Sequence, residues 1–386
     1  MTRQRTRAIR HVMISTGLVA LSCAAVLTPG ANAAAGSPVQ TDTSTVRLDR
    51  GLDRLVEAGA PGAALLSRSY GRTLTLASGV ADLATQRPLR ANDRFRVGSL
   101  TKTYVATVIL QLSEERKLSL DTPIETYVPG LVPAGEGISV RQLLNHTSGL
   151  FEYEHDPRVF EPYLAGDFNH VTTPRQLVRI AVSHPPLFAP GSRYSYSNTN
   201  YIVAGLIVET VTSNTLESEV QRRIIKPLRL RATTMPISSK LAGRHAHGYY
   251  VFDSPPATDV TYIFPFQWAA GSIAANTRDV ATFYRSLMRG KLLSPASMRA
   301  MKSTVPVPAD QGGGDYGLGL ARFPTPCGPA WGHNGNQPGY EAVALTSARG
   351  GHQSVLMINI DPSALSGAAI EKFEGLAQEA YCRGRR

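Results

Sequence analysis

Hydrophobic positions recur at two different spacings in the first hundred residues, and each spacing predicts a different element. In residues 46–59 (VRLDRGLDRLVEAG) apolar side chains recur at helical spacing until a Gly and a Pro end the pattern. Residues 62–69 and 72–82 are two strand-like runs around the turn signal YGR, which predicts a hairpin. A further short extended segment, RFRVGS, follows at 94–99.

The pattern changes after residue 100. Residues 101–112 (TKTYVATVILQL) are apolar on nearly every face, which is typical of a helix in the protein interior. Helical patterns at 139–150 and 200–228 then alternate with loops rich in Pro and Gly. Two strand patterns, 340–348 and 352–360, and a final helical pattern at about 365–381 complete the chain.

This order of elements predicts an α/β protein whose sheet is built from both ends of the chain. The α/β domain is expected to comprise residues 44–118 and 276–386. An all-helical domain over 119–275 is expected to be inserted between them. Residues 34–43 (AAGSPVQTDT) have the composition of a linker.

The N-terminus predicts export. Four arginines without an acid precede an apolar run from about Val12 to Leu27, and Ala31-Asn32-Ala33 has the small-x-small form of a cleavage site. We expect residues 1–33 to be a signal peptide cleaved after Ala33, which makes the mature protein secreted. An uncleaved membrane anchor is the alternative, but the apolar run is short for one, and stable membrane insertion is not expected.

Charge and cysteine content change with that cleavage. The formal charge of +11 falls to +7 when the four arginines leave. No dense Lys/Arg run with interleaved aromatic residues is present, so nucleic acid is not an expected partner. Of three cysteines, Cys327 and Cys382 remain, and an even pair in an exported protein predicts a disulfide. Two buried free thiols are the alternative.

Ser99 and Lys102 are the first candidate catalytic residues. They stand three positions apart at the start of the predicted buried helix, so both side chains share one helix face. Free N–H groups at a helix N-terminus favour developing negative charge there. The alternative is an ordinary helix start, at which Ser is a favoured residue.

Two further triplets are ambiguous when each is taken alone. Tyr196-Ser197-Asn198 follows a Pro-Gly loop signal, and its alternation of Tyr and Ser would also suit an edge strand. His333-Asn334-Gly335 precedes a strand pattern, where a plain Asn-Gly turn is the alternative.

Together and in this order, Ser-x-x-Lys, Tyr-x-Asn and His-x-Gly resemble the serine β-lactamase and penicillin-binding protein superfamily. The runs NHTSGL (145–150), YSYSNTNY (194–201) and YGLGL (316–320), with the two cysteines, are most similar to its secreted actinomycete D-alanyl-D-alanine carboxypeptidases. The resemblance spans about residues 46–382. It implies an antiparallel sheet flanked by helices, an inserted helical domain, and an active site in the cleft between them.

The resemblance and the chemistry together assign the first four catalytic roles. Ser99 is the expected nucleophile, and Lys102 becomes its base if burial lowers the pKa of the amine. Tyr196 is expected to relay the serine proton to the leaving group. Asn198 is expected to hold Lys102 and the substrate amide.

The strand side of the expected site carries His333, Gly335 and Asn336. Gly335 would let the acyl group lie against the backbone. The N–H groups of Ser99 and Asn336 would form the oxyanion hole. No glutamate on a separate deacylation loop is identifiable, and no cofactor is expected. The expected partners are a peptidoglycan stem peptide or a β-lactam, bound by a monomer.

The expected substrate-binding residues depart from the family pattern. Asn334 stands where these carboxypeptidases carry Thr, and Ala321 follows YGLGL where they carry Arg. Arg322 lies one place further on, and on a strand that offset turns a side chain to the opposite face. Phe266 and Trp268 are candidates for a pocket wall, with plain core as the alternative. The departures predict weaker dependence on a free C-terminal carboxylate and action on D-amino-acid amides or esters.

Two other motifs in the sequence are weak evidence for a binding site. GGGDYG (312–317) has the spacing G-x-G-x-x-G but does not lie between a strand and a helix. His245 and His247 lack a third ligand at metal spacing, so no metal site is expected and we interpret them as structural. Three functions stay open: a serine D-alanyl-D-alanine carboxypeptidase, a β-lactamase or esterase/D-amidase on the same scaffold, and a catalytically silent penicillin sensor.

Overall fold

The computed structural model describes residues 43–384 except 166, 168–169, 253–254 and 263–266. The predicted signal peptide, nearly all of the linker, and Phe266 therefore lie outside the described residues. No described helix combines the length and apolar character needed to cross a membrane.

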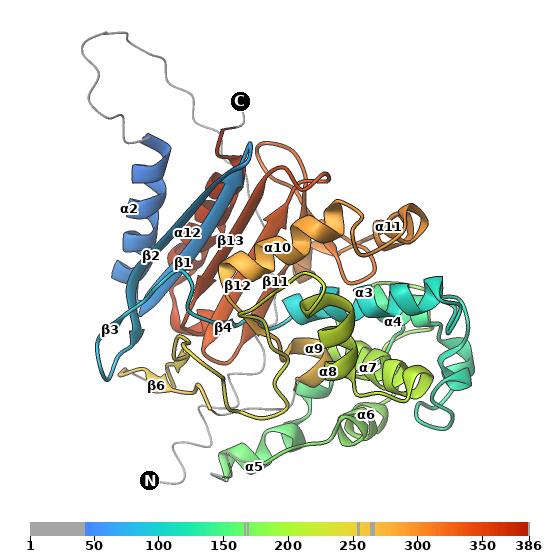
Figure 1. The fold of residues 1–386 in the computed structure, drawn as a ribbon. Coiled ribbons are helices and arrows are strands. Elements are labelled where there is room, and N and C mark those ends of the chain that lie inside the picture. The colour runs from blue at the N-terminus through green and yellow to red at the C-terminus, as the bar shows by residue number, and fades with distance from the viewer. Residues whose placement is uncertain (1–42, 166, 168–169, 253–254, 263–266, 385–386) are drawn as a thin grey trace, which may run out of the picture.

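The central feature is an antiparallel sheet of nine strands in the order β3-β2-β1-β13-β12-β11-β10-β9-β8 (Figure 1). Strands from both ends of the chain meet at its centre, where β1 pairs with β13. The strands are β1 (Gly62–Ser69), β2 (Arg72–Asp82), β3 (Arg87–Pro88), β4 (Phe95–Arg96), β5 (Tyr249–Tyr250), β6 (Thr258–Asp259), β7 (Ala274–Ala275), β8 (Val305–Pro306), β9 (Asp315–Tyr316), β10 (Ala321–Phe323), β11 (Ala330–Gln337), β12 (Tyr340–Thr346) and β13 (Gln353–Ile358).

Helices cover both faces of the sheet. Along the chain, further helices lie between the N-terminal strands and the C-terminal strands of the sheet. The helices are α2 (Thr43–Glu57), α3 (Leu100–Glu114), α4 (Val140–Leu144), α5 (Glu161–Leu164), α6 (Pro174–Val182), α7 (Asn198–Thr212), α8 (Leu216–Val220), α9 (Trp268–Gly271), α10 (Thr277–Met288), α11 (Pro295–Met301) and α12 (Gly367–Cys382). Figure 1 shows α2 and α12 on one face of the sheet and α10 on the other. This is the predicted α/β fold.

The alternation of side chains along the strands separates two hydrophobic cores. Leu65 on β1 packs in the core under α2 and α12, whereas its neighbour Leu66 packs in the larger core with α3, α7 and α10. Successive strand residues point to opposite faces, so one strand can serve both cores. α3 is buried on nearly every side, as its pattern predicts.

The region between residues 119 and 275 is less regular than predicted. The pattern at 139–150 forms a helix only over Val140–Leu144, because Asn145 caps it and His146 takes a left-handed conformation with φ 60°. The pattern at 200–228 breaks at Ser213, whose φ of 55° separates α7 from α8. The two-residue strands β5, β6 and β7 also lie in this region.

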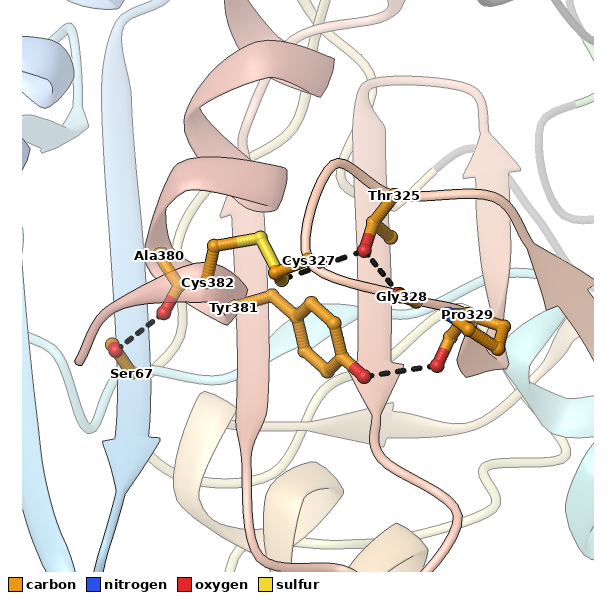
Figure 2. The surroundings of a disulfide bond; sticks show 8 residues. All are labelled: Ser67, Thr325, Cys327, Gly328, Pro329, Ala380, Tyr381 and Cys382. Atoms are coloured by element: carbon orange, nitrogen blue, oxygen red, sulfur yellow. Dashed lines mark hydrogen bonds between the residues drawn. A yellow bond between two sulfur atoms is a disulfide. The ribbon is translucent and has the colours of Figure 1, made fainter. Parts of the chain in front are cut away.

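The predicted disulfide between Cys327 and Cys382 is present, with an S–S distance of 2.00 Å. It joins the loop before β11 to the last residue of α12 (Figure 2). Nearby, the Tyr381 hydroxyl donates to the Pro329 carbonyl at 3.0 Å and the Ser67 hydroxyl donates to the Ala380 carbonyl at 2.7 Å. The end of α12 is thereby fixed to β1 and to the segment that leads into β11.

Candidate active site

Ser99 occupies the N-cap position of α3, yet its hydroxyl does not cap the helix. Its Oγ lies 2.8 Å from Lys102 Nζ and accepts a hydrogen bond from the Tyr196 hydroxyl at 2.7 Å. An ordinary N-cap serine accepts from a backbone N–H of its own helix. The Ser99 side chain is therefore held by groups of two different elements, which an ordinary helix start does not require.

Lys102 is fully buried, because α3 is enclosed on all sides at this point. Besides Ser99 Oγ, its Nζ contacts Asn198 Oδ1 at 2.6 Å and the Ala270 carbonyl oxygen at 2.8 Å. Burial lowers the pKa of the amine from 10.5 to about 7, although nearby carboxyl groups act against that shift. Near neutral pH the amine is thus available in its unprotonated form.

Two glutamates, the buried Glu152 and the half-buried Glu154, act electrostatically on this amine and were not expected from the sequence. Glu152 accepts hydrogen bonds from the backbone N–H groups of Asn198 and Glu154, the latter at 3.0 Å. Glu154 accepts from Gln267 Nε2 at 3.1 Å. Burial raises the pKa of both carboxyl groups, that of Glu152 to about 8. In the sequence they are two acids in the loop run FEYEH, and nothing there indicates their burial.

Tyr196 stands across the site from α3. Burial raises the pKa of its hydroxyl well above 10, so the side chain is a neutral phenol that donates to Ser99. The ring lies 4.9 Å from Lys102 Nζ and packs against the ring of His146, with centroids 4.3 Å apart. His146 Nδ1 accepts from the backbone N–H of Ser197 at 3.2 Å, which fixes the strand-like segment that carries Tyr196.

β11 forms the other wall of the site. Burial and the neighbouring Lys102 lower the pKa of His333 to about 3, so the imidazole is neutral. Its Nδ1 lies against the Asn334 carbonyl oxygen, which can only accept, so Nε2 accepts from the Tyr316 hydroxyl 2.8 Å away. Any Cβ on Gly335 would clash with the Val97 carbonyl and lie 2.9 Å from Ser99 N. A glycine is therefore required for β11 to approach Ser99.

Two cavities lie at the site, and Ser99 lines the larger of them. The larger, about 230 Å³, is lined by Ser99, Tyr196, Asn334 and Asn336, among other residues. The smaller, about 20 Å³, is lined by Tyr196, His333, Asn334 and Arg322 together with parts of β9. Asn334 thus lines both cavities, and Asn336 lines the larger one.

Other predicted substrate-binding residues lie differently. Arg322 is exposed on β10 and its Nη1 lies 3.1 Å from Asp315 Oδ2 on β9, so an ion pair already engages its guanidinium. Trp268 packs against Gly205 of α7 and donates to Glu217 at 2.6 Å. Trp268 is absent from the described lining of both cavities.

The two histidines outside the site have local partners. His245 Nε2 lies 3.1 Å from the Tyr262 hydroxyl, and His247 Nδ1 lies 2.7 Å from Asp259 Oδ2. Among the described residues no group of three or more His, Cys, Asp or Glu side chains could hold a metal ion.

Comparison with known proteins agrees with this geometry. A family profile described as Beta-lactamase matches residues 48–379. Penicillin-binding protein 4* of Bacillus subtilis is 26% identical over 287 residues, which is 69% of this chain but 61% of that protein. The match therefore spans less than two thirds of that relative's length.

Two solved structures are similar over most of both chains. The D-stereospecific amidohydrolase from Streptomyces sp. is 37% identical, with a TM-score of 0.78, over 85% of this chain and 98% of its own. The D-amino acid amidase from Ochrobactrum anthropi SV3 is 26% identical, with a TM-score of 0.78, over 89% of this chain and 100% of its own. The profile match covers most of the sequence, and the expected motif residues Ser99, Lys102, Tyr196 and Asn198 meet in the fold. The chain belongs to the β-lactamase family, within the superfamily of serine β-lactamases and penicillin-binding proteins.

Proposed function

We propose that this protein is an exported serine amidohydrolase that cleaves the amide on the carbonyl side of a D-amino acid residue. The observation that carries the proposal is the ion pair between Arg322 and Asp315. Arg322 is the only arginine among the described residues that line the two cavities of the site, and no lysine is among them. A substrate with a free terminal carboxylate would have to compete with Asp315 for that guanidinium. The names of the two amide-hydrolysing structural relatives support the D-configuration.

The proposed acylation begins at Lys102. A neutral amine has two hydrogens and one lone pair, and the Asn198 and Ala270 oxygens are placed to accept the two hydrogens. The lone pair is then left for the proton of the Ser99 hydroxyl, 2.8 Å away. Ser99 Oγ attacks the amide carbon as its proton passes to Lys102. The N–H groups of Ser99 and Asn336 would stabilise the oxyanion.

Tyr196 is the proposed proton donor to the leaving amine. As the C–N bond breaks, the phenol gives its proton to the nitrogen and regains one from Lys102, so the ester on Ser99 and the free amine are formed without net charge. Water then attacks the ester by the reverse sequence, which leaves a free acid and the starting enzyme. The cavity on the Tyr196 and His333 side has a volume of about 20 Å³, which is room for a leaving group the size of ammonia or water.

A D-alanyl-D-alanine carboxypeptidase is the second candidate. It is favoured by the penicillin-binding relative and by the amide side chain of Asn334 at the site opening, which can donate to a carboxylate. An amide donor lacks the charge-assisted strength of a guanidinium. The two candidates therefore differ in how strongly the enzyme should prefer a free C-terminal acid.

The deciding experiment compares kcat/KM for a peptide ending in D-Ala-D-Ala with that for its C-terminal amide. Ser99→Ala serves as the background, and the L-configured amide serves as the control for stereochemistry. We expect the amide to be cleaved at least as well as the acid. A preference for the acid above about a hundredfold, or roughly 2.7 kcal/mol, would establish the carboxypeptidase instead.

Export completes the proposal. It rests on the N-terminal sequence, and the Cys327–Cys382 disulfide is compatible with an oxidising compartment. N-terminal sequencing of the protein secreted by its host should begin after Ala33, whereas an N-terminus that retains residues 1–33 would contradict cleavage.

A further inference from the structure

The larger cavity beside Ser99 extends away from the catalytic residues and under the sheet. Ser99 and Tyr196 line one part of it, and residues of β12 and α12 line the rest. On β11 and β12, Asn336 is paired with Glu341, so both side chains lie on the same face of the sheet, the face covered by α12. The cavity thus connects the nucleophile to the interior space between β12 and α12.

Most of the cavity wall is apolar. Its volume of about 230 Å³ is below the range of roughly 300–1,000 Å³ that is usual for whole drug-sized ligands, which suits one part of a substrate. The apolar side chains that line it include Phe323, Val343, Leu345, Ile358 and Phe373. Such a wall favours an aliphatic chain over a polar one.

Two carboxyl groups interrupt this wall, Glu341 from β12 and Glu374 from α12. Burial raises the pKa of both, that of Glu374 to about 7, and the neighbouring acids Asp361 and Glu371 add to the effect. Neither lysine nor arginine occurs among the described residues that line the cavity, although the chain as a whole carries a formal charge of +11. A cationic group on a ligand would supply a positive charge close to these two carboxyl groups and so favour their ionised form.

The position of the cavity identifies which part of the substrate it faces. Tyr196, the proposed proton donor, lines both cavities, but the small one has a volume of about 20 Å³, which is room only for a leaving group the size of ammonia or water. The large cavity is the one lined by Ser99 and Asn336, whose N–H groups are proposed to bind the oxyanion. The group that continues from the carbonyl carbon on the acyl side is therefore directed into the large cavity.

We propose that this cavity is the acyl subsite and that it binds an aliphatic chain ending in a primary ammonium, the chemistry of a D-lysine side chain. The inference rests on the proposed function, because it assigns the acyl part of the amide cleaved at Ser99. The four-carbon stem would lie along the apolar wall, with the ammonium at Glu341 and Glu374.

The first experiment uses two esters that differ only at the end of the acyl chain, 4-nitrophenyl 6-aminohexanoate and 4-nitrophenyl hexanoate. Both have the same leaving group, and the amine of the first stands as far from the carbonyl carbon as the side-chain amine of lysine. The protonation state of Lys102 affects both kcat/KM values equally and cancels in their ratio. The ratio therefore reports how well the acyl subsite binds the terminal ammonium. It is measured near pH 8, where a group with a pKa of about 7 is mostly ionised, with Ser99→Ala as background.

We expect the amino ester to be preferred about tenfold or more. Glu341→Gln and Glu374→Gln should each reduce that preference, measured as the ratio of the two kcat/KM values, severalfold. Glu57→Gln is the matched control, because Glu57 is an exposed acid on α2, the helix that packs beside α12. If Glu341→Gln fails to fold, Glu374→Gln decides alone, since Glu374 is a half-buried residue of α12.

A second pair separates the subsite from the proposed function. D-lysine amide and D-norleucine amide differ by the side-chain ammonium, and only an amidase cleaves either one. Preference for the amino ester with neither amide cleaved would support the subsite and reject the amidase. Equal cleavage of both amides, or an ester ratio near unity, would reject the subsite. A preference that neither glutamine variant reduces would reject it as well.

Discussion

Protonation of Lys102 should set the pH dependence of Ser99 acylation. With its ordinary pKa of 10.5, about one amine in 3,000 would be neutral near pH 7. Burial lowers the pKa to about 7, so about half of the molecules carry the free base at that pH, a gain of roughly a thousandfold. Because the base must be neutral to accept the serine proton, acylation should rise with pH through about 7 and then level off.

Replacing Glu152 by Gln tests how nearby carboxyl groups affect the pKa of Lys102. Glu152 accepts from the Asn198 N–H with Oε2 and from the Glu154 N–H with Oε1, and the single oxygen of a glutamine keeps only one of these two hydrogen bonds. The substitution also removes a charge that raises the pKa of Lys102. The acidic limb of the profile should therefore move to lower pH. A nearby charge shifts a pKa by about one to three units, but Glu152, with a pKa of about 8, is itself mostly protonated near pH 7. We expect a shift of up to about one unit.

The assay is the second-order rate constant for acylation by a chromogenic ester, followed from about pH 5 to about pH 10. Glu161→Gln provides the control, because Glu161 is an exposed acid at the start of α5. A profile that stays low through neutral pH and rises only toward pH 10 would show that Lys102 keeps its ordinary pKa. A limb that moves to higher pH in Glu152→Gln would refute the assigned sign.

Further predictions concern single groups. Ser99→Ala should abolish the covalent adduct with penicillin seen by mass spectrometry while the circular dichroism spectrum is unchanged, and an adduct on this variant would exclude Ser99 as nucleophile. Lys102→Ala should lower kcat/KM by about two to four orders of magnitude, and near-normal turnover would mean another base. Replacing Cys327 and Cys382 by Ser opens a loop of 55 residues and should lower the free energy of unfolding by about 4 kcal/mol in denaturant titrations, and an unchanged free energy would contradict the stabilising role of the disulfide. Gly335→Ala should push β11 away from Ser99 and slow acylation at least about tenfold with a folded protein, and normal acylation would contradict the close approach.

The sequence predicts those features that depend on local pattern. The hairpin of β1 and β2, the buried helix α3 and the terminal helix α12 follow from the spacing of apolar positions, and the structure has all three. The contact between Ser99 and Lys102 follows from helix geometry, because residues three apart share a face. Tyr196 joins them from a distant segment, and there the ordered motif, rather than periodicity, supplied the expectation.

The features that the sequence does not predict depend on tertiary contacts. Nothing in the run FEYEH distinguishes a buried glutamate from an exposed one, because burial is decided by α7 and α9 folding over the loop. The ion pair of Arg322 depends on the register that sets it opposite Asp315 in β9. The helix boundaries predicted for 139–150 and 200–228 were wrong for a similar reason. His146 and Ser213 take left-handed conformations, which end the helices although the apolar pattern continues.

One electrostatic property connects the proposed function with the proposed acyl subsite. His333 is neutral throughout the physiological range, Lys102 must be neutral to act, and Arg322 is paired with an acid. A carboxylate that enters beside Ser99 would lose its hydration and meet only a cation that Asp315 already pairs with among the described lining residues, and such a loss is costly. An ammonium that enters the larger cavity instead meets two carboxyl groups, Glu341 and Glu374. The same distribution of charge therefore disfavours a free C-terminal acid on the leaving side and favours a basic group on the acyl side.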